Sequence, residues 1–124
     1  MGHLRLTGFA GYLAGEVREI LPGETIVVGR SRSCGFSLRK SAKWKAEGKS
    51  EAQADPAFRA VSRKHARIAV LPEGKVEIEG LGANGTFVDG IRIDKILLTD
   101  LARKSHELKM GPQEKLRLEW IHEA

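Results

Sequence analysis

Most of this 124-residue sequence consists of short runs in which apolar and polar residues alternate. The clearest run is His65–Leu71, which is separated by the turn signal Pro72–Gly74 from a second run containing Val76 and Ile78. A period of two places successive side chains on opposite faces of a β-strand, whereas a helical face repeats every three to four residues. The pattern therefore predicts strands joined by tight turns.

Similar strand-like runs occupy much of the remaining chain. Pro22-Gly23 favours a hairpin that joins the run Val17–Leu21 to the run Thr25–Val28. Asp89-Gly90 favours a hairpin with a two-residue turn. With the two runs above, the total of about eleven short strands and no strong helix predicts an all-β fold, an antiparallel β-sandwich. The runs are Leu4–Phe9, Val17–Leu21, Thr25–Val28, Gly35–Leu38, Thr86–Val88, Ile91–Ile93, Ile96–Leu98, His106–Met110 and Lys115–Trp120.

The length predicts one domain over residues 1–124. Within it, the segment from about residue 40 to residue 60 loses all period-two order. We expect a long inserted loop with little regular structure, although its composition permits a helical turn or two. Trp44 and Phe58 are the expected anchors of this insert.

Composition and termini indicate a cytoplasmic protein. Hydrophobic residues make up 41% and charged residues 30% of the chain, as in globular domains, and no run approaches the length of a membrane span. The N-terminus lacks the regions of a signal peptide. The single Cys34 cannot form an internal disulfide, which agrees with a reducing compartment, and we expect a buried or idle thiol.

Positive charge is concentrated in one part of the chain. The formal net charge is +5, but Arg30–Arg67 holds eleven Lys or Arg against three Asp or Glu, a net charge of +8. Such a local field attracts phosphate groups of peptides, nucleic acids or lipids, and it also occurs on faces that only keep a domain soluble.

Three short stretches with polar or glycine-containing turns adjoin the apolar runs: Gly29–Ser31, Val61–Ile68 and Asn84–Thr86. Loops held by strands are where binding residues concentrate, so we expect these turns to meet and form one anion-binding surface. An arginine offers a planar fork of donors to phosphate oxygens, and a serine hydroxyl can complete the shell. An asparagine can donate and accept at once, as binding to an extended peptide backbone requires.

In this order on such a scaffold, the turns resemble the motifs of the forkhead-associated (FHA) domain, a phosphothreonine-peptide recognition module with a SMAD/FHA-like sandwich. The likeness covers nearly the whole chain. Each piece alone is common, but three pieces in order between fitting strands form a specific pattern. The matching pieces are Gly29-Arg30, Ser62-x-x-His65 and Asn84-Gly85.

The resemblance implies a role for each matching residue. Arg30 and Ser62 would bind the phosphate, Arg63 would lie beside it, and Asn84 would hydrogen-bond the peptide backbone. The residues that would support the loops structurally are Gly29, His65 and Gly85.

The chain also departs from the family pattern. Ala83 stands where many members carry a threonine that adds a contact near the phosphate. The insert is longer than the usual connection before Ser62, and it could cover the site or shape the preference for residues after the phosphothreonine. Asp100–Ser105 replaces the usual turn before the last strands, which leaves the site untouched.

The expected partner is a phosphothreonine-containing protein, the substrate of a Ser/Thr kinase, and no membrane partner is expected. A nucleic-acid binder is a less favoured alternative, because only Trp44 and Phe58 lie near the basic segment as candidates for base stacking. A scaffold that binds proteins without phosphate is another. The sequence carries no evidence on oligomeric state.

We expect no enzyme, cofactor or metal site. No nucleophile, base and orienting acid can be assembled from motifs, and His65 has no second ligand at a metal-like spacing. Gly80-x-Gly82-x-x-Gly85 matches a dinucleotide-binding fingerprint in spacing alone, because a strand rather than a helix is predicted to follow it.

Overall fold

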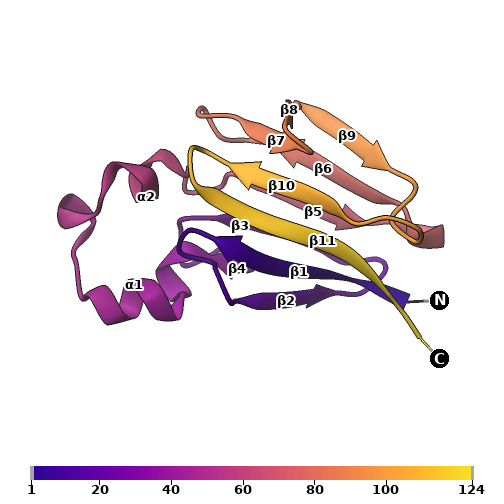
Figure 1. Cartoon of the computed structure of the whole chain (residues 1–124), viewed down its shortest axis with the longest axis horizontal. Coiled ribbons are helices and arrows are strands. Elements are labelled where there is room, and N and C mark those ends of the chain that lie inside the picture. Colours follow the sequence, from indigo (N-terminus) through magenta and orange to yellow (C-terminus); the bar gives the residue numbers. More distant parts are fainter. Residues whose placement is uncertain (1, 124) are drawn as a thin grey trace.

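The computed structural model describes residues 2–123 and consists of two β-sheets packed face to face (Figure 1). Their strand orders are β2-β1-β11-β10-β7-β8 and β4-β3-β5-β6-β9, which confirms the predicted sandwich of eleven strands. The strands are β1 (Gly2–Ala10), β2 (Val17–Ile20), β3 (Thr25–Gly29), β4 (Phe36–Ser37), β5 (Ala66–Val70), β6 (Val76–Gly80), β7 (Thr86–Val88), β8 (Ile91–Arg92), β9 (Lys95–Leu98), β10 (His106–Met110) and β11 (Glu114–His122).

The strand pairs are antiparallel except for one. β3 and β4 pair in parallel through Val28 with Phe36 and Gly29 with Ser37. The longest ladder joins β1 to β11, the two nine-residue strands. In β1 every second residue is buried, and Leu4 and Leu6 are completely inaccessible, as the period of two requires.

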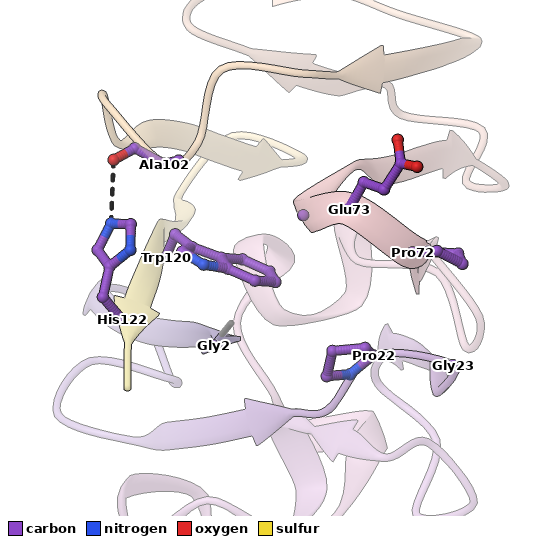
Figure 2. Close-up of a pocket in the computed structure, with 9 residues that line it drawn as sticks. Gly2, Pro22, Gly23, Pro72, Glu73, Ala102, Trp120 and His122 are labelled. Carbon is purple, nitrogen blue, oxygen red and sulfur yellow. Dashed lines mark hydrogen bonds between the residues drawn. The ribbon is translucent and has the colours of Figure 1, made fainter. Parts of the chain in front are cut away.

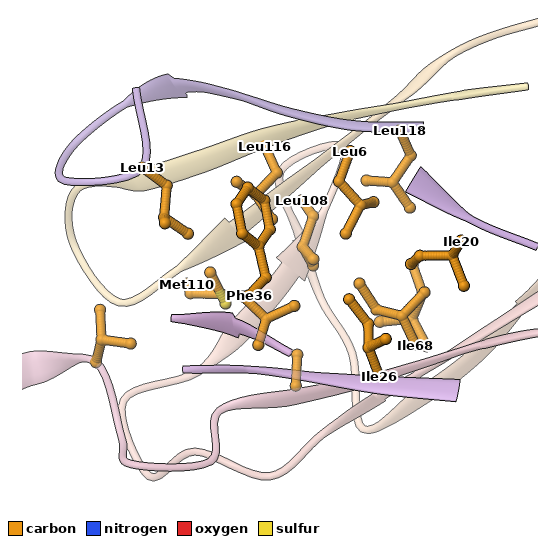
Figure 3. Close-up of a cluster of buried hydrophobic side chains, with 14 of the residues drawn as sticks. Leu6, Leu13, Ile20, Ile26, Phe36, Ile68, Leu108, Met110, Leu116 and Leu118 are labelled. Carbon is orange, nitrogen blue, oxygen red and sulfur yellow. The ribbon is translucent and has the colours of Figure 1, made fainter. Parts of the chain in front are cut away.

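The core lies between the sheets. Figure 3 shows Leu6, Leu108 and Leu116 of one sheet facing Ile26 and Ile68 of the other. Because both inner faces are lined by aliphatic side chains, this layer supplies the hydrophobic stabilisation that holds the loops at its ends in place.

The predicted hairpins are correct in part. β5–β6, β7–β8 and β10–β11 are antiparallel neighbours, and Asp89 and Gly90 both have positive φ (50° and 83°), as expected for the favoured two-residue turn. The hairpin predicted at Pro22-Gly23 is wrong. There the chain passes from one sheet to the other, because β2 pairs with β1 whereas β3 pairs with β5.

The insert is more regular than the sequence predicted. Its helices are α1 (Ala42–Glu47) and α2 (Pro56–Ala60), and 3₁₀ turns span Leu38–Lys40 and Glu51–Gln53; a further 3₁₀ turn, Pro72–Gly74, lies between β5 and β6. Each α-helix begins at a capping side chain: Ser41 Oγ accepts from the N–H of Trp44 at 3.1 Å, and Asp55 Oδ1 from the N–H of Phe58 at 2.9 Å.

An aromatic cluster attaches the insert to the sandwich. The rings of Trp44 and Phe58 stack with centroids 4.0 Å apart, and Tyr12 packs edge-on against both. All three side chains are buried, so Trp44 and Phe58 are the anchors that the sequence predicted. The insert lies at one end of the sandwich and the chain termini lie at the other (Figure 1).

Candidate functional site

Three loops meet at the end of the sandwich that carries the insert. We name them loop A (residues 30–35, between β3 and β4), loop B (residues 61–65, between α2 and β5) and loop C (residues 81–85, between β6 and β7). Two backbone hydrogen bonds join loops A and B. Arg30 N–H donates to the Ser62 carbonyl at 3.0 Å, and Ser31 N–H donates to the Arg63 carbonyl at 3.1 Å. These bonds hold the backbones of Arg30 and Arg63 close together.

Gly29 makes the close approach of loops A and B possible. A Cβ atom there would lie 2.4 Å from the Arg63 carbonyl oxygen, a backbone atom that cannot move aside. The buried thiol of Cys34 donates to the same oxygen, with 3.0 Å between Sγ and O. Gly29 and Cys34 thus fit the two loops together without contributing a charge.

His65 connects loop B to loop C and to β3. Its Nδ1 accepts from the N–H of Ser62 at 3.0 Å, and its Nε2 donates to the carbonyl of Gly85 at 2.7 Å. Its own N–H donates to the carbonyl of Val28 at 2.9 Å. Because a backbone N–H can only donate, Nδ1 must be unprotonated and Nε2 must carry the hydrogen. Burial lowers the pKa of His65, which keeps the ring neutral at neutral pH.

Gly85 occupies a position that other residues rarely adopt. Its φ is +89°, and a Cβ there would lie 2.9 Å from the Phe87 ring. Its carbonyl accepts from both His65 and the N–H of Gly111, at 3.2 Å in the second case. Loop C is therefore attached to loop B and to the end of β10.

Arginine side chains converge where loop A meets loop B. A hollow of about 220 Å³, which we call the arginine hollow, is lined by Arg30, Ser31, Arg39, Glu51 and Arg63. Arg30 Nε donates to the Val61 carbonyl at 2.9 Å, which fixes the plane of its guanidinium. Glu51 of the insert forms ion pairs with Arg30 and Arg39.

The charge of the hollow is positive and only partly compensated. Three guanidinium groups face one carboxylate, that of Glu51. Burial and the nearby charges of Arg63 and Arg39 lower the pKa of Arg30, although a guanidinium remains protonated at neutral pH. Like charges held together in a partly buried place favour the binding of an anion, which relieves their repulsion.

Two further predicted residues, Ser62 and Asn84, do not line the hollow. Ser62 contributes its backbone to the contacts with loop A and with His65, and its hydroxyl makes no hydrogen bond to any other residue between 2 and 123. Asn84 is exposed in loop C, and its Nδ2 donates to the carbonyl of Ala60 at 2.9 Å. That bond joins loop C to the end of the insert.

Sequence reasoning missed two residues of the hollow, Arg39 and Glu51. Both belong to the region of the insert, where no alternation or motif showed which side chains face the loops. Only the turn that carries Glu51 has a local sequence signal, a capping box, and that signal does not show which way the Glu51 side chain points. Ser50 N–H donates to the Gln53 side chain at 2.9 Å in a capping box that starts the turn containing Glu51.

A second hollow adjoins the first through Arg39. This basic hollow measures about 470 Å³ and lies against α1. It is lined by five Lys or Arg side chains and by Trp44. Its lining residues are Arg32, Arg39, Lys40, Trp44, Lys45, Gly48 and Lys49.

A larger pocket lies at the opposite end of the sandwich, near the termini. It measures about 590 Å³, is mostly apolar, and has the Trp120 ring in its wall, so we call it the Trp120 pocket (Figure 2). On the same strand, His122 Nε2 donates to the carbonyl of Ala102 at 3.1 Å. None of the predicted site residues lines this pocket.

Within residues 2–123 there is no group of three or more His, Cys, Asp or Glu side chains arranged to hold a metal ion. Among the same residues, no helix has the length and apolar character needed to cross a membrane.

Comparison with solved structures gives close matches in fold. An FHA domain of an Arabidopsis thaliana hypothetical protein is 24% identical with a TM-score of 0.71, and the match covers 100% of this chain and 90% of that one. An FHA domain from Chlamydia trachomatis is 23% identical with a TM-score of 0.70, covering 97% and 99%. A third, from work on phosphothreonine-dependent FHA domain interactions, is 19% identical with a TM-score of 0.66, covering 98% and 99%.

Identities this low establish the fold alone. A comparison with curated proteins found no match. The sequence profile of the FHA domain, however, matches residues 26–111, which include all three loops and the whole insert. The chain therefore belongs to the forkhead-associated (FHA) domain family.

Proposed function

We propose that this chain, acting as one module over residues 1–124, binds phosphothreonine in an extended peptide of a partner protein, in signalling or assembly. The arginine hollow carries the proposal. It gathers Arg30 and Arg63 from separate loops into a positively charged recess at the end of a rigid sandwich. Membership of a family that includes phosphothreonine-dependent interactions supports the same conclusion.

The proposed roles follow from the chemistry of each group. Arg30 and Arg63 offer guanidinium donors to the phosphate oxygens, and Ser62, the residue before Arg63 in loop B, adds a hydroxyl. Asn84 binds the peptide backbone from loop C through its exposed amide. Gly29, His65 and Gly85 act only by shaping and joining the loops, as their contacts support.

FHA domains are interaction modules rather than enzymes. We accordingly expect no catalytic residue and no cofactor in this chain. A module that binds threonine phosphorylated by a Ser/Thr kinase would act where the kinase acts, which agrees with the cytoplasmic location expected from the sequence.

The basic hollow suggests which peptides bind best. It shares Arg39 with the arginine hollow and has four further cationic side chains. We propose that it receives acidic side chains that flank the phosphothreonine, because opposite charges attract most strongly across a recess from which water is partly excluded.

The experiment that tests the function is a binding titration of a peptide array whose members carry phosphothreonine, phosphoserine or unmodified threonine. Arg30→Ala should weaken phosphothreonine binding at least about tenfold, because a hydrogen bond to a charged group contributes roughly 1.5–3 kcal/mol and about 1.4 kcal/mol corresponds to tenfold. Arg103→Ala, which removes an exposed arginine of the loop between β9 and β10, should bind like the wild type.

Arg30→Lys separates charge from geometry. It keeps the positive charge but loses the planar fork, so its affinity should fall between those of wild type and Arg30→Ala. Equal binding of phosphorylated and unmodified peptides would contradict the proposal. So would equal binding by Arg30→Ala and wild type.

The alternative of nucleic-acid binding is less well supported in the structure. Its only favourable observation is the positive charge of the insert and loops. The two aromatic residues that could have stacked on bases, Trp44 and Phe58, are both buried and stack on each other. A nucleic-acid complex would have to rely on phosphate contacts alone, and its affinity would fall steeply with salt.

A further inference from the structure

The insert places a carboxylate inside the arginine hollow. Both oxygens of Glu51 are used: Oε1 contacts the guanidinium of Arg30, and Oε2 lies 2.9 Å from a terminal nitrogen of Arg39. Glu51 is half-buried in this position, with 30% of its side chain exposed, and Arg30 is more deeply buried, at 15%. A carboxylate that bridges two guanidinium groups occupies the place where an anionic ligand would bind.

The segment carrying Glu51 is short and lies between two fixed points. On one side, α1 is anchored by the buried Trp44, and on the other α2 is anchored by Phe58, whose ring is completely inaccessible. Ser50, Ala52 and Gln53 beside Glu51 are exposed and contribute no side chain to the core, whereas Ala54, which follows them, is buried in it. Local movement of Glu51 therefore leaves the aromatic anchors in place.

Arg39 has a donor that the protein does not use. Its Nε is buried and is the one side-chain nitrogen or oxygen of this kind, within residues 2–123, that lacks a hydrogen-bond partner. A carboxylate has two oxygens, and Glu51 divides them between Arg30 and Arg39. A phosphate monoester has three terminal oxygens and a charge near −2, so it can engage the same two arginines and Arg63 as well.

We propose that Glu51 is an internal ligand of the phosphate site and that Arg39 is an additional phosphate-binding residue, so that a phosphothreonine peptide binds by displacing the Glu51 carboxylate. The inference rests on the proposed function. It makes the insert a competitor for the site: the apparent dissociation constant equals the intrinsic one divided by the fraction of molecules in which Glu51 has left the hollow.

This competition predicts whether each of two substitutions raises or lowers the affinity for phosphothreonine peptides. Glu51→Gln keeps the shape of the side chain but removes its charge, which weakens the contact with the arginines, so phosphothreonine peptides should bind about 3- to 10-fold more tightly. Arg39→Ala should weaken binding about 3- to 10-fold, because one guanidinium is lost from the phosphate while Glu51 still contacts Arg30.

Matched controls remove the same charges far from the hollow. Glu73→Gln changes a glutamate in the turn between β5 and β6, which borders the Trp120 pocket, and Arg103→Ala changes an exposed arginine near that end. Both should bind like the wild type. These controls change the net charge as much as Glu51→Gln and Arg39→Ala do. An effect of net charge on peptide affinity would therefore appear in the controls as well, and it would decline with salt.

The test combines isothermal titration with a phosphothreonine peptide from the array and side-chain Nε–Hε NMR spectra of the ligand-free protein. Tighter binding by Glu51→Gln than by Glu73→Gln, weaker binding by Arg39→Ala than by Arg103→Ala, and shifted Arg30 and Arg39 signals in ligand-free Glu51→Gln are the expected results. Binding by Glu51→Gln alone, with none by the wild type, would support the inference more strongly.

Two results would overturn the inference while leaving the proposed function standing. One is a wild type that binds phosphothreonine with the same affinity as Glu51→Gln. The other is weaker binding by Glu51→Gln, which would mean that Glu51 orients the arginines for the ligand. If neither protein binds any phosphorylated peptide, the proposed function fails and the inference fails with it.

Discussion

The two ends of the sandwich are built alike, but the charges around their hollows and histidines differ. Each end has a hollow and a buried histidine that joins loops. At the insert end His65 is neutral and the hollow holds three arginines against one glutamate. At the other end the hollow is larger and apolar, and His106 lies between two carboxylates.

The comparison shows that charge distribution, rather than the size of a hollow, marks the candidate site. His106 Nδ1 lies 2.5 Å from Asp89 and its Nε2 lies 2.6 Å from Asp100, so a protonated ring there is fully compensated. The His65 ring hydrogen-bonds only to backbone groups, so it brings no carboxylate to the arginines, and the hollow keeps an excess of positive charge over Glu51. An anion is therefore attracted to the smaller hollow.

The largest expected effect comes from removing the histidine of the insert end. His65→Ala leaves the Ser62 N–H and the Gly85 carbonyl without their partner in a buried place, and it opens a cavity, so it should cost about 2–4 kcal/mol of the free energy of unfolding. Phosphothreonine binding should fall at least about tenfold even at temperatures where the variant is folded, since loops B and C lose their connection.

His106→Ala is the matched variant at the other end. It removes a buried ring and two charged contacts, so it should cost about 1–3 kcal/mol of stability, measured by urea denaturation, without changing peptide affinity. If His106→Ala reduced binding as much as His65→Ala, the two ends would not be functionally distinct.

The pH dependence of stability should differ in sign between the two histidines. Burial lowers the pKa of His65 below its ordinary value of 6.5, so the unfolded state binds the extra proton below that pH, and stability falls as the pH falls toward the folded pKa. For His106, burial opposes protonation, but the hydrogen bonds and charges of Asp89 and Asp100 prevail and raise its pKa above 6.5.

The stability that protonated His106 contributes to the folded state is therefore fully present below pH 6.5, and it is lost as the pH rises through the raised pKa of the folded state. Urea midpoints measured between about pH 5 and pH 9 test this. His106→Gln should remove the loss of stability as the pH rises, and His65→Gln should remove the loss of stability as the pH falls below 6.5. The same pH profile for both variants would contradict the assignment of one neutral and one charged histidine.

The smallest expected effect concerns the basic hollow. Peptides with acidic residues beside the phosphothreonine should bind about two- to fivefold more tightly than neutral ones, because exposed ion pairs contribute about 0.2–1 kcal/mol each, and the advantage should shrink with salt. Lys45→Glu should abolish this preference, whereas Arg103→Glu, outside the basic hollow, should keep it. Equal preference in both variants would show that the hollow does not contact the peptide.

Much of the sandwich could be predicted because its signals are local. Alternation identifies a strand wherever one face is buried, as for Ala66, Ile68 and Val70, and the positive φ values of Asp89 and Gly90 follow from the residue types in that turn. Turn chemistry does not say which sheet the next strand joins. The chain around Pro22-Gly23 crosses between sheets instead of folding back as a hairpin, because pairing partners are chosen by tertiary contacts.

For the candidate site, motifs were enough to name the loop residues but not the groups that reach them from the insert. Arg30 and Arg63 lie in turns that the sequence singled out, and the structure brings both to the hollow. Glu51 is twenty-one positions from Arg30 in the sequence, and its place depends on how the aromatic cluster orients α1 and α2. No local pattern encodes such an arrangement.

The central claim is that phosphothreonine binds at the insert end, and mapping a phosphopeptide by ¹H–¹⁵N NMR tests it most directly. Titration of the labelled protein with the best phosphothreonine peptide of the array should shift the backbone amides of Arg30, Ser62 and Asn84, with little change near Trp120. The unphosphorylated peptide should shift neither group. Shifts concentrated around the Trp120 pocket, or identical shifts with and without the phosphate, would contradict the account.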